Sequence, residues 1–125
     1  MIVRIVEVAI GGSLGATARF LAMELLRRRL GSGYPFGTLF VNVAGCFVLG
    51  LVLGYASARG IGVIERHMLL VVGFLGSFTT FSTFIADADA LGQRENPGAM
   101  LIYLVASVAL GFGAFMLARS IGRLF

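Results

Sequence analysis

Four long apolar runs, separated by short polar segments, occupy most of this 125-residue chain. They lie near residues 3–23, 37–58, 68–91 and 98–118, and each is nearly free of charge. A helix needs about 20 apolar residues to cross the hydrocarbon core of a bilayer. Only 13% of the residues are charged, against roughly a quarter in soluble domains. The chain is therefore predicted to be an all-α, multi-pass membrane protein with no room for a soluble domain.

The polar segments between the runs predict where the helices end. They read "RRRLGSGYP" at 27–35, "SARGIGVIER" at 57–66 and "GQRENPG" at 92–98. Glycine and proline interrupt helices, and Pro97 suits either a turn or the first position of a helix. We expect one transmembrane domain over residues 1–125, with helices near 3–29, 37–58, 66–91 and 98–122.

The basic residues predict topology and not a nucleic-acid partner. The sequence pI is about 10.2, and all ten lysine-plus-arginine residues are arginines. Apart from Arg19 they lie at the ends of spans, where lipid headgroups and topology explain them. Four spans put both termini and the 57–66 loop on one side. That side holds Arg4, Arg59, Arg66, Arg119 and Arg123, and the other holds Arg27, Arg28, Arg29 and Arg94.

Five arginines against four give almost no positive-inside bias, so the chain is expected to insert in both orientations. Two oppositely inserted copies can pair as an antiparallel homodimer. A four-helix membrane protein of this size also has little interior in which to build a pathway alone. Within the spans, the Gly-x-x-x-Gly pairs Gly11/Gly15 and Gly50/Gly54 predict close helix–helix contacts.

The stretch "GFLGSFTTFSTF" at 73–84 combines glycines, hydroxyls and three phenylalanines inside the third span. Glycines and β-branched threonines favour a break near the middle of this helix. A break frees carbonyl groups, which suit a small cation, and N–H groups, which suit an anion. Phe81 and Phe84 share a helical face, where electropositive ring edges can line an anion path. On spacing alone, however, ordinary packing of these two rings with Phe78 is favoured over a pore lining.

Three further in-span features each have two interpretations. Arg19 either snorkels to the interface or draws anions into an aqueous vestibule. Asn42 either bonds a neighbouring helix or offers its NH2 donors to a dehydrated anion. Tyr103 and Ser107, four residues apart, form a polar stripe or bond within their own helix.

The sequence offers no arrangement typical of an enzyme. It has no Ser/His/Asp set, no paired carboxylates within a span and no glycine-rich phosphate loop after a strand. The lone Cys46 is best explained as a small buried apolar residue. No catalytic residues are expected.

Three segments in series resemble motifs of the Fluc family of bacterial fluoride channels. "GGSLGATARF" resembles the first-helix motif through Gly12, Gly15, Ala16 and Arg19. "GTLFVNVAG" resembles the second-helix motif, and "GFLGSFTTFSTF" resembles the third-helix signature. Order, spacing and chain length agree, and the resemblance covers essentially the whole chain.

This resemblance implies a passive, fluoride-selective channel in the bacterial inner membrane that exports cytoplasmic fluoride. It implies two pores per antiparallel dimer and a structural sodium ion at its centre. The sodium would be held by the carbonyls of Gly76 and Thr79, and Arg19 matches the first-helix arginine. The pore residues expected on this basis are Asn42, Thr80, Phe81, Ser82, Thr83, Phe84, Tyr103 and Ser107.

The chain departs from the family pattern at three positions. Gly111 falls where some members carry a hydroxyl, and Asp87 stands where many have glutamate. Phe78 is bulkier than the small or aliphatic residue expected there. These differences bear on the length of the polar track and on packing at the dimer centre.

Two other functions are open to a chain of this kind. A small multidrug-resistance type transporter is also a four-helix, dual-topology dimer, but it needs a proton-exchanging carboxylate in the first span. Glu7 lies only a few residues in, and Arg19 would repel cationic substrates. A non-transporting accessory subunit would tolerate changes at Asn42 and at the phenylalanines.

Overall fold

The computed structural model describes residues 1–60, 62 and 67–125, and within them every regular element is a helix. Four helices are long and apolar enough to cross a membrane, with 29, 23, 27 and 26 residues. The predicted all-α architecture with four spans is confirmed. The predicted start of the third helix at residue 66, and with it Arg66, lies outside the described residues.

The described helices are α1 (Ile2–Leu30), α2 (Phe36–Ala58), η1 (Met68–Leu75), α4 (Gly76–Phe78), α5 (Phe81–Arg94) and α6 (Pro97–Gly122).

The helix ends follow from local sequence. α1 stops at Gly31, whose φ of 81° is a left-handed conformation that glycine adopts without strain. α6 begins after Asn96, whose side chain accepts a hydrogen bond from the Ala99 N–H at 2.9 Å. Pro97 occupies the first turn of α6, which confirms the second of the two positions predicted for it.

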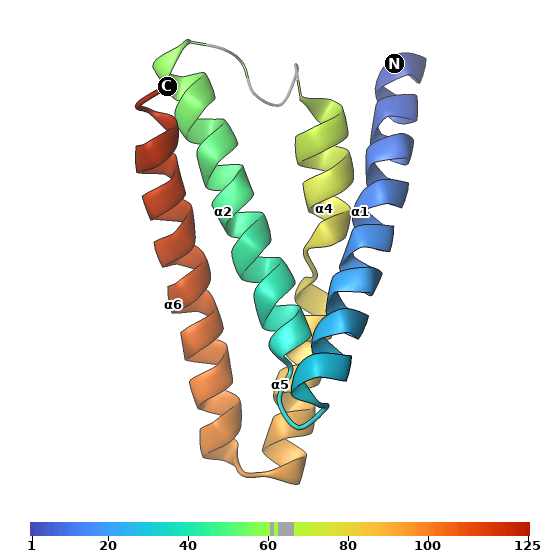
Figure 1. The fold of residues 1–125 in the computed structure, drawn as a ribbon, viewed down its shortest axis with the longest axis vertical. Coiled ribbons are helices and arrows are strands. Elements are labelled where there is room, and N and C mark those ends of the chain that lie inside the picture. The colour runs from blue at the N-terminus through green and yellow to red at the C-terminus, as the bar shows by residue number, and fades with distance from the viewer. Residues whose placement is uncertain (61, 63–66) are drawn as a thin grey trace.

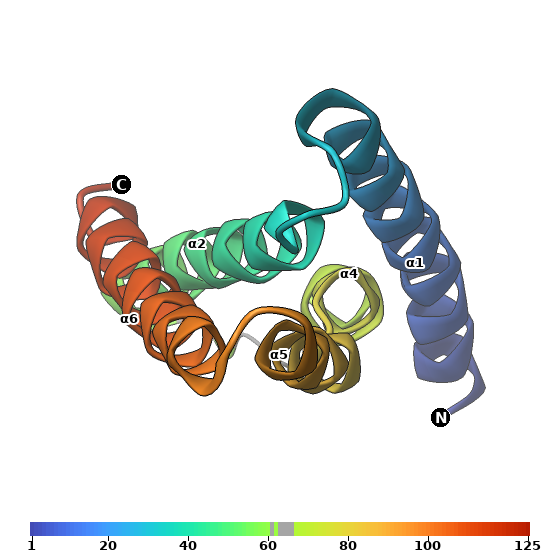
Figure 2. The same ribbon diagram turned by 90° about the horizontal axis from the view of Figure 1, so that it is seen from below.

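The spans are arranged as two packed pairs. α2 runs along α6, and α1 packs against η1 and α4 (Figure 1). α5 continues the third span toward the opposite end of the molecule and contacts the start of α6. Seen from below, α1 and α6 lie at opposite edges, with α4 and α5 between them (Figure 2). Both termini lie at the same end, as an even number of spans requires.

Small residues allow the helices in each pair to approach closely. A Cβ atom added at Gly11 or Gly15 of α1 would collide with main-chain atoms of η1. A Cβ atom at Gly50 or Gly54 of α2 would collide in the same way with the main chain of α6. The contacts predicted from both Gly-x-x-x-Gly pairs are therefore confirmed.

A cluster of buried apolar side chains lies where α5 meets α6, and it consists of Phe84, Ala88, Leu91 and Tyr103. Val41, Ala56, Leu75 and Ala118 are buried elsewhere in the described chain. Large apolar side chains elsewhere, on α1 and on the outer face of α6, are mostly exposed in the single chain. In a bilayer such surfaces contact lipid or another helix, so their exposure is compatible with a membrane protein.

Candidate functional site

The third span is interrupted between α4 and α5. Thr79 (φ −84°, ψ 160°) and Thr80 (φ −150°, ψ 117°) have extended backbones, whereas the residues on either side are helical. This is the stretch in which glycines and β-branched residues predicted a break. Within a bilayer, extended backbone requires partners for its N–H and C=O groups, because no water satisfies them.

Asn42 of α2 supplies those partners. The Thr80 N–H donates to Asn42 Oδ1 at 2.8 Å, and Asn42 Nδ2 donates to the Thr80 carbonyl at 3.0 Å. The amide therefore pairs with Thr80 much as a neighbouring β-strand would. α2 comes this close because Gly45 has no side chain, and a Cβ atom there would collide with the Thr79 methyl group.

The interruption removes the helical partners of two carbonyls. In a continuous helix the Gly76 carbonyl would accept from Thr80 N–H and the Thr79 carbonyl from Thr83 N–H. Thr80 N–H is instead given to Asn42, and Thr83 N–H donates to the Thr80 hydroxyl at 3.3 Å. Thr80 thereby caps α5, and its hydroxyl donates in turn to Thr83 Oγ1 at 3.0 Å.

Arg19 reaches the interruption from α1. Its Nη1 donates to the Thr79 carbonyl at 3.4 Å, and the side chain is partly buried. Arg19 also lines a pocket of about 530 Å³ between the end of α1, the following loop and α5. Arg27, Arg94, Thr38, Thr83 and Asp87 line the same pocket, which places three arginines around it.

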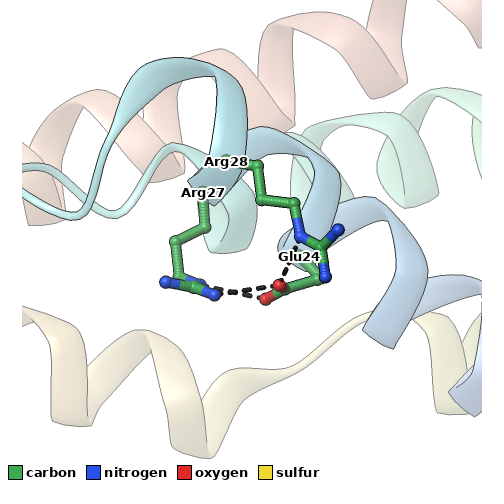
Figure 3. Close-up of polar contacts among 3 residues, drawn as sticks. All are labelled: Glu24, Arg27 and Arg28. Atoms are coloured by element: carbon green, nitrogen blue, oxygen red, sulfur yellow. Dashed lines mark hydrogen bonds and ion pairs between the residues drawn. The ribbon is translucent and has the colours of Figure 1, made fainter.

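One carboxylate at the rim of this pocket is held by two arginines (Figure 3). Arg27 donates through Nε and Nη2 to the two oxygens of Glu24, at 2.9 and 2.8 Å, and Arg28 Nε donates to Oε1 at 2.7 Å. The three side chains carry a net positive charge. The rim therefore presents more positive than negative charge, which favours anions at the entrance.

The two phenylalanines predicted to share a face have different surroundings. Phe81 is 76% exposed, whereas Phe84 is 7% exposed in the core. Their ring centroids are 6.0 Å apart, and Phe84 lies 5.3 Å from the Tyr103 ring at a tilt of 51°. Phe84 is buried because Tyr103 of α6 packs against it, whereas none of the described elements covers Phe81 to the same degree.

Two hydroxyls beside Phe84 lack partners. Tyr103 is fully buried, and its Oη and the Ser107 Oγ have no hydrogen-bond partner among the described residues. Buried hydroxyls without partners are uncommon and mark places where a ligand or water fits. Tyr103 and Ser107 are on α6 at the spacing that predicted a polar stripe.

A contact that the sequence did not predict joins α2 to α5. The buried Thr38 hydroxyl donates to Asp87 Oδ2 at 2.5 Å, and both residues line the pocket beside Arg19. Asp87 was noted only as a departure from the family pattern. Its partner lies 49 residues away in sequence, so spacing could not have indicated the pair.

The predicted site residues thus fall into three groups within the chain. Asn42, Thr80, Thr79 and Arg19 meet at the interruption, and Thr83 extends this group into the pocket. Phe84, Tyr103 and Ser107 form the second group on the α5–α6 side. Phe81, Ser82 and Gly76 are exposed on the surface of the single chain.

Phe78, whose bulk had no explanation in the sequence, stacks on Phe74. The two ring centroids are 5.7 Å apart and the rings are nearly parallel, at 13°. A Cβ atom at Gly45 would lie 3.7 Å from the Phe78 ring, so α2 also packs against it. Phe78 is therefore a packing residue at the junction of η1, α4 and α2.

Comparisons with known proteins match this chain along nearly all of its length. A model of the CrcB-like protein family, described as camphor resistance (CrcB), matches residues 6–119. A protein of Rhizobium leguminosarum bv. trifolii named fluoride-specific ion channel FluC is 42% identical over 93% of each chain. Proteins of the same name are 40% identical in Paracoccus denitrificans, over 94% of this chain and 92% of that one, and 37% identical in Agrobacterium fabrum, over 97% of both.

Proposed function

Because this chain belongs to the CrcB-like protein family, we propose that it is a fluoride-selective channel of the bacterial membrane. The observation that carries the proposal is the 42% identity, over 93% of both chains, with a protein named fluoride-specific ion channel FluC. The channel lets cytoplasmic fluoride leave passively, down its gradient, and carries out no enzymatic reaction. The four spans form one transmembrane domain.

Passive export suits the chemistry of fluoride. HF crosses a membrane in acid surroundings and ionises in the more neutral cytoplasm, where the anion is trapped. A selective leak is enough to release it, so no coupling to protons is required. The only charged side chain in the middle of α1 is Arg19, whose positive charge attracts anions.

The entrance of the proposed path is the pocket lined by Arg19. Arginine charge there concentrates fluoride, and Asn42 stands next to the pocket at the interruption. The Asn42 NH2 group has two N–H donors, of which one is used by the Thr80 carbonyl. The second donor is proposed to contact fluoride as it loses water.

Beyond Asn42, the proposed path runs between ring edges and hydroxyls. The edges of Phe81 and Phe84 are electropositive and attract an anion without binding it as tightly as a fixed charge would. The unpartnered hydroxyls of Tyr103 and Ser107 can donate to fluoride, because each carries a rotatable O–H. The hydroxyls of Thr80, Ser82 and Thr83 complete the set of pore residues.

The proposed assembly is an antiparallel homodimer with two pores. Phe81 is exposed next to the buried Phe84, so a second copy would be needed to enclose the Phe81 ring. The nearly equal arginine numbers at the two ends permit both orientations in the membrane. The dimer also compensates for the small core of the single chain.

A structural sodium ion at the centre of this dimer is part of the proposal. The carbonyls of Gly76 and Thr79 lose their helical partners, and carbonyl oxygens are hard ligands that suit a small cation. Gly76 is exposed, and a Cβ atom there would have only the Val71 carbonyl near it, at 3.9 Å. These residues therefore fit the ion, with two oxygens from each copy. When bound, the sodium supplies positive charge that neutralises the carbonyl dipoles.

The transporter alternative is not favoured. Proton exchange for cationic substrates needs a carboxylate in the middle of the first span, and Glu7 lies in the second turn of α1. The pocket is instead lined by three arginines and two carboxylates, and this net positive charge disfavours cations.

The test is ion release from liposomes that contain the purified protein and a potassium ionophore. Fluoride should leave and chloride should stay, as followed with ion-selective electrodes. Equal release of both anions would contradict selectivity. Fluoride release that requires a proton gradient would contradict a passive channel.

A further inference from the structure

Arg19 and the proposed sodium ion have a ligand in common. The Thr79 carbonyl is one of the two oxygens proposed to hold sodium, and the same oxygen accepts the hydrogen bond from Arg19 Nη1 at 3.4 Å. It is free to do so because its helical donor, the Thr83 N–H, is given to the Thr80 hydroxyl. The positively charged Arg19 guanidinium thus already contacts the Thr79 carbonyl oxygen.

One carbonyl oxygen can serve both partners. It has two lone pairs, and 3.4 Å is long for an N–H···O hydrogen bond, so the Arg19 contact uses little of its acceptor capacity. Arginine keeps its charge at every physiological pH. A sodium ion on the same oxygen would therefore meet a like charge within a few ångströms, well inside the Debye length at physiological salt.

We infer that Arg19 sets the sodium affinity of the dimer, holding it below the value that the carbonyls alone would give. This inference rests on the sodium site of the proposed function. Before two copies meet, the guanidinium keeps the Thr79 carbonyl partnered within the bilayer. After assembly, sodium and Arg19 share that oxygen. Arg19 is accordingly a positioning residue for the interruption as well as part of the pocket.

The contact also links the two ions that the protein is proposed to bind. Arg19 lines the pocket through which fluoride is proposed to enter, and it touches the oxygen on which sodium would sit. Repulsion between sodium and the guanidinium would bias the guanidinium toward the pocket. Coupling of this kind is reciprocal, so anions in the pocket would also favour sodium.

The test measures the sodium dependence of thermal unfolding of the full-length dimer in detergent. Sodium chloride is exchanged for N-methyl-D-glucamine chloride at constant ionic strength, because a ligand that binds only the folded state raises Tm. The variants are Arg19→Gln and Arg19→Met, which remove the charge, and Arg19→Lys, which keeps it. Arg4→Gln is the matched control, since Arg4 is exposed in the first turn of the same helix and does not line the pocket.

Removing the charge should lower the sodium concentration at half-maximal stabilisation by about tenfold. Arg19→Lys and Arg4→Gln should stay within about twofold of the parent protein, because the first keeps the local charge and the second changes a distant one. The two neutral variants are run in parallel, so that the result does not depend on the folding of either one.

Three outcomes would overturn the inference. An unchanged midpoint in the neutral variants would mean that Arg19 does not oppose sodium. A higher midpoint in the neutral and lysine variants together would mean that the guanidinium merely orients the carbonyl. A parent protein whose Tm ignores sodium would remove the proposed sodium site itself, whereas the first two outcomes leave that site standing.

Discussion

At the scale of single residues, the two phenylalanines of α5 illustrate how one sequence pattern leads to two environments. Spacing placed Phe81 and Phe84 on one face and left packing and pore lining as alternatives. Phe84 is packed against Tyr103, but Phe81 is 76% exposed. Packing within the chain therefore explains Phe84 and leaves Phe81 unexplained. An exposed ring beside an exposed Ser82 is what an incomplete pore wall would present.

Substituting each ring by isoleucine separates these roles. Both Phe81→Ile and Phe84→Ile should slow fluoride release about fivefold, because each removes a ring edge worth about 1 kcal/mol. Only Phe84→Ile should also lower the free energy of unfolding, by about 1 kcal/mol, since only that ring is packed within the chain. Electrode-monitored efflux and chemical unfolding measure the two effects.

Phe112→Ile is the control, because Phe112 on α6 is 66% exposed and lies outside the site. It should leave efflux unchanged. Normal efflux in both α5 variants would rule out the ring-lined pore.

At the scale of elements, the interruption of the third span shows what sequence reasoning can reach. Glycines and β-branched threonines indicated where the helix would break, because these residues weaken a helix locally. What fills the break was not predictable, since Asn42 lies 38 residues from Thr80 and pairs with it only after α2 packs through Gly45. Asn42 was predicted either to bond a neighbouring helix or to contact an anion. These two roles are compatible, because its NH2 group has two N–H donors, one for each role.

The Thr38–Asp87 pair was missed for the same reason. A threonine near a helix start and an aspartate near a helix end are each common in isolation. Only the approach of α2 to α5 brings the two side chains to 2.5 Å. Residues within one motif could thus be predicted, whereas contacts between motifs required the packed structure.

Two substitutions at Asn42 distinguish support of the interruption from ion conduction. Asn42→Ala leaves the Thr80 N–H and C=O without partners, so it should destabilise the protein by about 1–3 kcal/mol and stop efflux. Asn42→Asp keeps an acceptor for the Thr80 N–H but replaces the donor by a negative charge. It should therefore abolish fluoride efflux with a smaller loss of Tm than Asn42→Ala, because the Thr80 N–H keeps its acceptor although the Thr80 carbonyl loses its donor.

The control for Asn42→Ala is Asn96→Ala, which removes the cap of α6 far from the interruption. It should cost about 1 kcal/mol of stability and leave efflux normal. If Asn42→Asp conducts at the parent rate, the amide donor has no part in permeation.

At the scale of the whole molecule, the described chain buries few of its side chains. Eight of its described apolar residues are buried, its helices form two pairs, and its candidate pore wall is open at Phe81. The arrangement places both termini at one end, as the sequence predicted from four spans. The arginine balance predicts what the single chain does not display, namely insertion in two orientations followed by pairing of opposite copies.

Orientation can be fixed by adding arginines at exposed positions. One variant carries Ser57→Arg and Ser120→Arg, which gives seven arginines at the end that holds the termini and four at the other end. The second variant carries Ser32→Arg, Gln93→Arg and Arg123→Gln, which gives four arginines at the end that holds the termini and six at the other end. Because the positive-inside rule acts on short loops, each biased protein should insert in one orientation, as read from a tag on its N-terminus.

Each biased protein expressed alone should then lack a partner of opposite orientation. It should therefore restore fluoride resistance only poorly to a fluoride-sensitive bacterium. Their co-expression should restore resistance fully, because opposite copies can pair again. Full resistance from either biased protein alone would show that a parallel arrangement conducts and that dual topology is unnecessary.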